Sequence, residues 1–512
     1  MKVLGGASVA ELAEEAAGRL PPAAIPQVAG VSISTSDSES VVSDDLSRPS
    51  FGSDTSTSIP SSGDEDPTVV RLAPLSLIQE NTWRIQKQLA DDPTIFHNTV
   101  GLFLEGNLDL DKLYKAVLAS LNRHEVFRTA IRHLEEDGEA VQVVLNSPTT
   151  SLRCVEVPDQ EAAESALRQL QAEEYDLSSG EAMKVVDFHW AEDRHLFVIA
   201  YHRLTGDGST TDNLFVELGQ IYGGAQLPAP PQYADFSVRQ RSDRKHGRLD
   251  MAIAYWKSMY AALPPVLPLL PLPQAKQQRP GGLSWQQHTA SFRLNGVVAQ
   301  RVKEAARRLK ATPMHFYLAA YKTLLATMTG QDDLVIGLAD TNRSSIDDIS
   351  TMGFFANMLP IRMDSPSNKK FDEVVSEIKD RMRKAMLHSA APYGVVLKEL
   401  GLVGSDAPSA RQMAHEPLIQ AAFDYRQGER ADSGKLGDAN IVKVMVTRER
   451  TPYDVSLEMA DDPSRDPLLT AKLQSSLYGP QDSEVFLKSY EAVLKIFSED
   501  TTLRIKDAMV NI

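Results

Sequence analysis

Two patterns of hydrophobic and polar residues alternate along the chain from Val69 onward. Short apolar runs, typical of buried β-strands, are followed by longer segments whose apolar residues recur at helical spacing. The run 195–200 (HLFVIA) predicts a buried strand, and 212–222 predicts a helix because its large apolar residues return every three or four positions. Further strands are predicted over 96–106, over 141–145 and within 184–200, and a further helix over 110–123.

The same alternation begins again near residue 289, after a proline-rich segment. Here the predicted elements are strands over 290–294 (ASFRL) and 334–339 and helices over 297–309 and 314–328. Alternating strands and helices are typical of α/β folds. We therefore expect an α/β protein with two lobes of comparable size, 69–260 and 281–512, joined by the proline-rich segment 261–280.

The residues before Val69 have a different composition. Residues 30–66 are dominated by Ser, Asp, Thr, Gly and Pro, which cannot bury enough apolar surface to offset the entropy lost on ordering. We expect a disordered linker with bounds 23–68. In residues 1–22, Ser8 and Glu11 are spaced as a capping box, which indicates a short terminal helix.

Composition and charge exclude several classes of protein. A net charge of −16 argues against a nucleic-acid-binding surface, which needs clustered Lys and Arg. The single cysteine, Cys154, excludes an internal disulfide framework and a CxxC metal site, and we expect it to be a buried thiol. The most apolar segment, 261–272, is too short and too rich in proline to span a bilayer. Because the acidic N-terminus lacks the apolar core of a signal peptide, we expect a cytoplasmic protein without a membrane span.

The strongest candidate for chemistry is the stretch 201–208 (YHRLTGDG), between the predicted strand and the helix that follows it. A strand end holds side chains rigidly, so His202, Arg203 and Asp207 are well placed to face a cavity. Histidine is the usual residue for proton transfer near neutral pH.

This stretch resembles the signature His-His-x-x-x-Asp-Gly of the condensation domains of nonribosomal peptide synthetases and of fungal polyketide–peptide hybrids. An alignment without gaps places His202 at the first histidine and Asp207 and Gly208 at the last two positions. Arg203 stands at the second histidine, to which the family's catalysis is assigned.

Other segments resemble the remaining motifs of the family, in the family's order and over about residues 70–500. They are 75–83 (LSLIQENTW), 123–129 (RHEVFRT), 233–236 (YADF), 336–343 (IGLADTNR), 352–362 (MGFFANMLPIR), and His388 with Pro392, Tyr393 and Leu397. Two further segments, 417–428 and 451–454, are similar to the branch linked to fungal polyketide synthases. The amino-acid sequence of residues 1–22 resembles that of the last helix of an acyl carrier domain, although an ordinary terminal helix remains the alternative.

The resemblance implies a fold and a set of partners. The fold is a V-shaped pseudo-dimer of two chloramphenicol-acetyltransferase-like lobes, with the active site at their seam. The domain binds no cofactor directly, because its substrate arrives on the phosphopantetheine of a carrier domain. The sequence itself shows no metal-ligand cluster, so we expect no metal site. The implied partners are the acyl carrier domain of the same megasynthase, a polyketide thioester, and a downstream adenylation or peptidyl carrier domain where one follows.

The resemblance also implies roles for single residues. Asp207 pairs with Arg343 as an architectural ion pair, and His202 packs beside the catalytic position. Gly208 supplies backbone freedom or close approach, or else a catalytic N–H. Asn357 and His388 match seam positions without an assigned role. The basic residues of 239–248 are either a solvated linker helix or a docking surface for an acidic carrier.

Three functional hypotheses remain open. A guanidinium stays protonated and offers only donors, so Arg203 cannot accept a proton from an amine. The first hypothesis is therefore a degenerate condensation domain that holds a carrier-bound polyketide and assists its folding, cyclisation or release. The second is an active domain that joins a carrier-bound polyketide to an aminoacyl group. The third is a free-standing acyltransferase that uses a CoA ester.

Overall fold

The computed structural model describes residues 68–509, except for 90, 135–137, 283, 365, 367, 405–406, 429–433 and 448–449. The carrier-domain helix expected over 1–22 lies outside the described residues, as does all but the last residue of the linker expected over 23–68. The residues from Thr68 onward form one compact unit.

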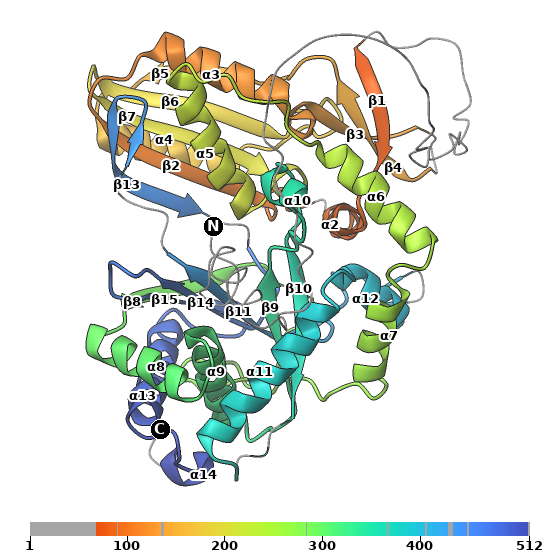
Figure 1. Cartoon of the computed structure of the whole chain (residues 1–512), viewed down its shortest axis with the longest axis vertical. Coiled ribbons are helices and arrows are strands. Elements are labelled where there is room, and N and C mark those ends of the chain that lie inside the picture. The colour runs from red at the N-terminus through yellow and green to blue at the C-terminus, as the bar shows by residue number, and fades with distance from the viewer. Residues whose placement is uncertain are drawn as a thin grey trace, which may run out of the picture. The chain divides into compact units, whose positions relative to one another are not determined.

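The first lobe is built on a six-stranded sheet with the strand order β12-β13-β2-β7-β6-β5 (Figure 1). Its strands are β2 (His97–Glu105), β5 (Leu152–Glu156), β6 (Met183–Ala191), β7 (Arg194–His202), β12 (Lys435–Leu436) and β13 (Ala439–Thr447). β7 is central and antiparallel to both β2 and β6. All of its residues from His195 to His202 are buried, which confirms the strand expected from the apolar run.

Helices cover both faces of this sheet. On one face, α3 (Leu110–Arg123) and α5 (Gly208–Tyr222) pack on Val100, Phe197 and Ile199. On the other face, α4 (Gln160–Ala172) packs on the strand residues that alternate with these, such as Leu196 and Val198. The alternation of side chains along each strand therefore produces two separate apolar layers.

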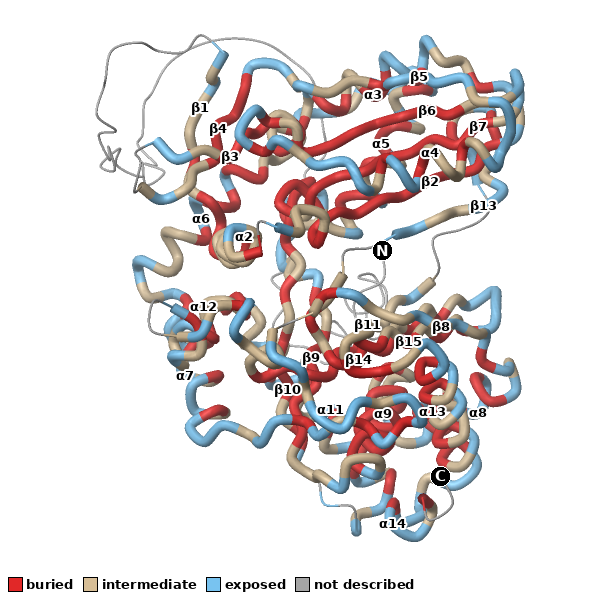
Figure 2. Tube along the Cα trace, turned by 180° about the vertical axis from the view of Figure 1, so that it is seen from behind, coloured by how far each residue is buried: buried red, intermediate tan, exposed pale blue. Residues whose placement is uncertain are grey.

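A second six-stranded sheet forms the core of the other lobe, with the order β10-β9-β11-β14-β15-β8. Its strands are β8 (Gln287–Arg293), β9 (Leu334–Asp340), β10 (Asn357–Met363), β11 (Ala421–Gln427), β14 (Val455–Asp461) and β15 (Leu468–Gln474). Its helices are α8 (Gly296–Arg308), α9 (Pro313–Thr329), α11 (Phe371–Leu387), α12 (Tyr393–Glu399), α13 (Asp482–Glu499) and the short α10 (Ile346–Ser350) and α14 (Ile505–Ala508). Figure 2 shows the buried residues concentrated in the two sheets and in helices such as α9.

A three-stranded sheet, β1-β4-β3, completes the first lobe. Its strands are β1 (Val69–Pro74), β3 (Thr129–His133) and β4 (Ala140–Leu145). The remaining elements are α2 (Leu77–Gln88), α6 (Tyr233–Lys245), α7 (Asp250–Met259) and the 3-10 turns η1 (Glu125–Arg128) and η2 (Arg203–Thr205). Ser76 and Gln79 form a capping box at the start of α2.

The two lobes exchange segments. β13 belongs to the second half of the chain but pairs with β2 of the first sheet, from Thr447 opposite Thr99 to Asn440 opposite Glu105. In the other direction, α7 and the proline-rich segment bury Trp256, Leu270 and Leu272 in the core of the second lobe. Neither exchange was anticipated from the local sequence pattern.

The sequence predicted the regular elements well, and the two-lobed α/β fold is confirmed. The helix expected over 110–123 coincides with α3, and the helix expected over 314–328 lies within α9. The expectation of a buried thiol was wrong, because Cys154 lies on β5 at the edge of the first sheet and is exposed.

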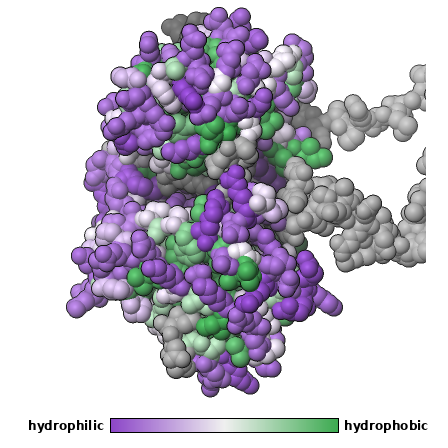
Figure 3. All heavy atoms as spheres, turned by 90° about the vertical axis from the view of Figure 1, so that its left-hand side faces the viewer, coloured by the Kyte–Doolittle hydropathy of each residue, from purple (hydrophilic) through white to green (hydrophobic). Residues whose placement is uncertain are grey.

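The surface is mostly polar. On the face drawn in Figure 3, hydrophilic residues predominate, and the hydrophobic ones gather in separate patches. Within the described residues, every helix is too short or too polar to cross a bilayer.

Candidate functional site

The stretch 202–208 turns the chain from β7 into α5. β7 ends at His202, the 3-10 turn η2 follows, and Asp207 is the N-cap of α5. The Asp207 carboxylate accepts the backbone N–H of Thr210 at 2.9 Å, which satisfies one of the free donors at the helix start. The strand and the helix therefore fix the position of each motif residue.

His202 is buried, and the ring nitrogen that carries its lone pair already accepts a hydrogen bond. Its Nδ1 accepts the backbone N–H of Leu204 at 3.2 Å, so the ring proton lies on Nε2, which is 3.4 Å from Oε1 of Gln86. Burial, with the nearby His97 and the charge of Arg203, lowers the pKa of His202 to about 3. At neutral pH His202 is an uncharged donor with no free acceptor nitrogen.

Aromatic rings surround His202 edge-on. Phe96, His97 and Tyr175 lie with ring centroids 6.0, 6.0 and 6.3 Å from its own. His97 stands opposite His202 in the β2–β7 pairing. Burial lowers the pKa of His97 to about 4, and its Nδ1 has no hydrogen-bond partner among the described residues. Sequence analysis missed His97, because only the strand pairing brings it next to the motif.

Arg203 contacts a segment from the second half of the chain that is buried in the core of the first lobe. Its backbone N–H donates to the carbonyl of Phe96 at 2.9 Å, and its guanidinium carbon lies 4.8 Å from the ring centre of Phe354. This geometry is a cation–π contact with the 352–362 segment. The second position of the motif therefore carries a positively charged side chain in contact with an aromatic ring.

Asp207 and Arg343 are in direct contact. Arg343 Nη2 donates to Asp207 Oδ1 at 3.0 Å, and both side chains are almost fully buried. Asp207 Oδ2 accepts the backbone N–H of Phe355 at 3.0 Å. Arg343 Nη1 donates to the carbonyls of Asp348 and Thr351, both at 2.5 Å, and its guanidinium lies over the ring of Phe355. These contacts hold the start of α5 against the second lobe.

Gly208 does not have the steric role that we expected. It is the first residue of α5, and a Cβ placed on it would meet no atom of the protein within 4 Å. The glycine that the fold requires is Gly353, whose φ is +157° and whose Cβ would lie 2.0 Å from the ring of Tyr233. The space beside Gly208 is open.

Asn357 and His388 both serve the second lobe. Asn357, at the start of β10, donates to the carbonyls of Ser389 and Ala391 and accepts the N–H of Tyr393 at 2.9 Å. His388 follows α11, and its ring stacks on Tyr255 of α7 at 4.1 Å. Among the described residues, the recorded contacts of these two side chains do not include the motif.

The basic residues of α6 are largely paired with carboxylates. Arg239 pairs with Asp348, Arg241 with Glu80, and Arg244 with Asp250 and Glu399; beyond the end of the helix, Arg248 pairs with Asp243. This pairing neutralises most of the charge that would attract an acidic carrier. It favours the interpretation of a solvated helix.

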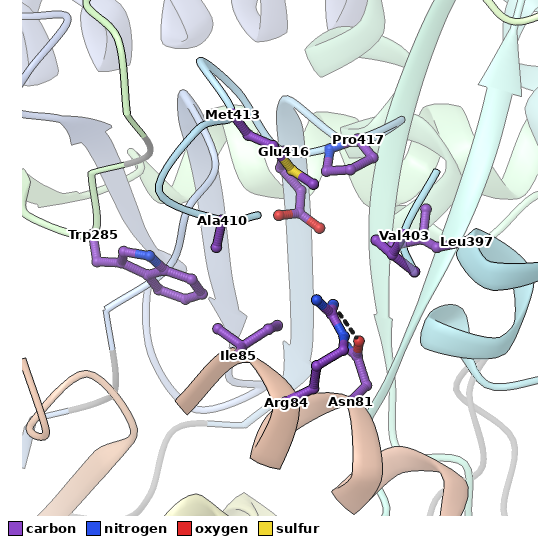
Figure 4. A pocket seen from close by; sticks show the side chains of 10 residues that line it. All are labelled: Asn81, Arg84, Ile85, Trp285, Leu397, Val403, Ala410, Met413, Glu416 and Pro417. Atoms are coloured by element: carbon purple, nitrogen blue, oxygen red, sulfur yellow. Dashed lines mark hydrogen bonds between the residues drawn. The ribbon is translucent and has the colours of Figure 1, made fainter. Parts of the chain in front are cut away.

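A pocket lies between α2 and the segment that precedes β11. It is narrow: about 20 Å³ is available to the centre of a water-sized molecule. Figure 4 shows Arg84 of α2 and Glu416 pointing toward one another across it, while Trp285, Ile85 and Met413 supply apolar walls. Trp285 packs edge-on against Phe96 at 5.6 Å, and Phe96 packs against His202. The pocket is therefore joined to the motif by two ring contacts.

Glu416 is an unusual carboxyl group. Burial raises its pKa to about 7, although the charge of Arg84 and a hydrogen bond from Tyr393 act in the opposite direction. A carboxyl group that titrates near neutral pH in a pocket is typical of a functional site. Sequence analysis missed Glu416, because the pKa shift depends on tertiary burial.

We predict strong coupling between Asp207 and Arg343 in a double-mutant cycle. Asp207→Ala should cost about 3–5 kcal/mol of unfolding free energy, because it leaves a buried guanidinium unpaired. Adding Arg343→Ala should then cost much less than a second full penalty. Chemical denaturation of the four proteins measures both terms.

The exposed pair Asp380–Arg383 on α11 is a matched control for this cycle. Its coupling should be close to zero, since solvent screens both charges. Additive losses at Asp207 and Arg343 would contradict the architectural role of the pair.

We predict that Glu416 makes stability depend on pH between about 4.5 and 7. Its folded pKa lies above the ordinary value of 4.5, so in this window the folded state holds a proton that the unfolded state releases. Stability due to this group is present at low pH and falls as the pH rises, by about 1.4 kcal/mol per unit of difference.

Denaturant unfolding at pH 5 and at pH 7.5 tests this assignment. Glu416→Gln keeps the shape and cannot ionise, so the variant should lose less stability over the interval than the natural protein. Glu161→Gln, at an exposed position on α4, is the control. Equal pH dependence in the natural protein and Glu416→Gln would show that Glu416 is ionised throughout.

Comparison with known proteins accounts for this geometry. The family model "Condensation domain" matches residues 69–510. The lovastatin nonaketide synthase, polyketide synthase component, of Aspergillus terreus (strain NIH 2624 / FGSC A1156) is 48% identical over 99% of this chain and 17% of its own length. A hybrid PKS-NRPS synthetase of an Acremonium species is 31% identical over 84% of the chain and 11% of its own length.

A solved structure agrees with these matches. The condensation domain from the monacolin K polyketide synthase MokA is 45% identical, with a TM-score of 0.80 over 86% of this chain and 100% of that one. The chain spans about a sixth of the length of its most similar curated relatives. The arginine in the motif is what led us to expect a terminal domain of the lovastatin nonaketide synthase type, and this resemblance is confirmed. The chain belongs to the condensation-domain family.

Proposed function

We propose that this domain binds a polyketide held as a thioester on a carrier domain and assists its folding, cyclisation or release. We further propose that its motif does not catalyse amide formation. Three relatives that are 45–48% identical are named as polyketide synthase components, and each aligns with 99% of this chain. Their names and this coverage support a polyketide as the bound chain.

The observation that carries the proposal is the lack of a proton acceptor in the motif. An amine that attacks a thioester must lose a proton, and a positioned base accepts it. His202 cannot be that base, since its Nδ1 accepts from Leu204 and its Nε2 bears the proton. Arg203 cannot be that base either, because a guanidinium has no acceptor atom.

The pocket of Arg84 and Glu416 supports the binding role. Ligand pockets combine apolar walls with a few polar groups that fix the orientation of the ligand. Trp285 and Ile85 supply such walls, and the facing charged groups supply hydrogen-bonding capacity for oxygen atoms of a polyketide.

The partners follow from the same proposal. The acyl chain would arrive on the phosphopantetheine of an acyl carrier domain of the same megasynthase, without a cofactor bound by this domain, and in the cytoplasm. We propose that residues 1–22 are the last helix of that carrier and 23–68 the linker. Alignment of nearly the whole chain with polyketide synthase components, against 84% with the hybrid synthetase, supports this division.

We predict that the natural protein binds an acylated carrier but transfers no acyl group to an amine. The test incubates the domain with a carrier that bears a synthetic acyl thioester and with an aminoacyl thioester, and follows the carrier by intact-mass spectrometry. Arg203→His should remain folded, because the smaller ring fits the space, and should form amide above background once a base is restored.

Two further variants sharpen this test. Arg168→His, at an exposed position on α4, controls for the loss of an arginine and should behave as the natural protein. Amide formation by the natural protein that is abolished in Arg203→Ala would contradict the proposal and would make arginine part of the catalytic machinery.

A further inference from the structure

The hairpin of β6 and β7 brings three potential metal ligands together at the end far from the motif. Asp187 and His189 are two residues apart on β6, so their side chains lie on the same face of the sheet. His195 of β7 stands directly opposite His189 in the strand pairing. His195 and His202 are seven residues apart on β7, about 23 Å along the strand, so this cluster is separate from the motif.

The ligand atoms of the three residues are close together. Nδ1 of His195 lies 3.0 Å from Oδ2 of Asp187, and Nδ1 of His189 lies 3.3 Å from the same oxygen. All three residues offer ligand atoms within 4.8 Å of one another. Two ligands bound tetrahedrally to zinc at about 2.0–2.1 Å lie about 3.3 Å apart, so these separations fit one shared cation.

Two of the buried polar atoms in the cluster lack hydrogen bonds. Asp187 is fully buried, and its Oδ1 has no partner among the described residues. His189 Nδ1 is close to the carboxylate but also has no hydrogen bond. Buried polar atoms are nearly always paired, so two exceptions at one place call for an ion or a water between them.

His195 is oriented as a metal ligand would be. Its Nε2 lies 3.4 Å from the backbone carbonyl of Glu192, in the turn between the two strands. Nδ1 of His195 forms a hydrogen bond with Oδ2 of Asp187, and a cation bound here would take the place of the proton between them while Nε2–H donates to the carbonyl. Metal-bound histidines usually donate their second ring N–H to such an acceptor, which fixes the tautomer.

We propose that Asp187, His189 and His195 form a binding site for a divalent transition-metal ion of the zinc type. Imidazole and carboxylate ligands suit zinc and its neighbours, and three protein ligands leave a fourth position for water. The side chain of His189 is 26% exposed, so solvent reaches the site from that side. A bound ion would cross-link β6 and β7 next to β5, the edge strand of the first sheet.

The sequence analysis expected no metal site, because the ligands do not form a CxxC pattern. The signal was Asp-x-His followed by a histidine on the next strand, and it has meaning only with the register of the hairpin known. Cys154 lies opposite Asp187 on β5 and is exposed, but its sulfur does not belong to the cluster. A substitution of Cys154 therefore controls for metal binding by a neighbouring thiol.

Isothermal titration of the chelator-treated full chain with Zn²⁺ tests the proposal, together with the absorption spectrum of Co²⁺ added in its place. We expect one ion per chain, and a melting temperature that rises with Zn²⁺ concentration. His189→Ala and Asp187→Asn should each weaken binding by more than about 100-fold, because they remove a ligand itself rather than an outer partner. His189 is partly exposed, so its variant keeps the test valid even where Asp187→Asn fails to fold.

Cys154→Ser and His246→Ala should bind Zn²⁺ as tightly as the natural protein, since one removes the neighbouring thiol and the other an exposed histidine of another element. The proposal is overturned if the natural chain binds no ion, if His189→Ala binds as tightly as the natural chain, or if Cys154→Ser abolishes binding.

Discussion

The Asp207 carboxylate is the point on which the arrangement of the motif depends. One oxygen caps α5 and accepts from Arg343, and the other accepts the backbone N–H of Phe355. Its donors come from the first turn of α5 and from the connections on either side of α10, and the group is almost fully buried. A buried carboxylate is stable only where such partners compensate for its lost hydration. The end of β7 and the start of α5 are therefore positioned against the second lobe by interactions that involve no catalytic residue.

Because the interactions that position the turn do not involve residue 203, an arginine can occupy that position without disturbing the fold. The contacts of Asp207 do not require a histidine at position 203. Arg203 instead lies against Phe354, one residue before the amide that donates to Asp207. His202 is held by Leu204 and by the surrounding aromatic rings. The turn between β7 and α5 is thus held without a histidine at position 203, and ring contacts of Trp285 and Phe96 connect it to the pocket.

The sequence predicted what depends on local pattern and on motif order. The strand ending at His202 and the helix after Asp207 follow from periodicity, and the family resemblance led us to pair Asp207 with Arg343. The structure places those side chains 3.0 Å apart. The role expected of Gly208 did not hold, because the steric constraint lies at Gly353 instead.

Features that arise from tertiary contacts could not be predicted. The pairing of β13 with β2 joins residues more than three hundred positions apart, and no local preference specifies that register. His97 and Glu416 are ordinary in sequence and acquire shifted pKa values only through burial. The exposure of Cys154 depends on β5 being an edge strand, which a five-residue run does not reveal.

The protonation state of His202 tests the central claim most directly. Nitrogen-15 NMR of the histidine-labelled protein reports the tautomer and the pKa of each ring, and a His202→Gln variant assigns the signal. The account predicts a neutral ring with its proton on Nε2 that persists well below pH 5, because burial lowers the pKa of His202 to about 3. A His202 signal that titrates near pH 6.5, or a proton on Nδ1 that leaves Nε2 free to accept, would contradict it.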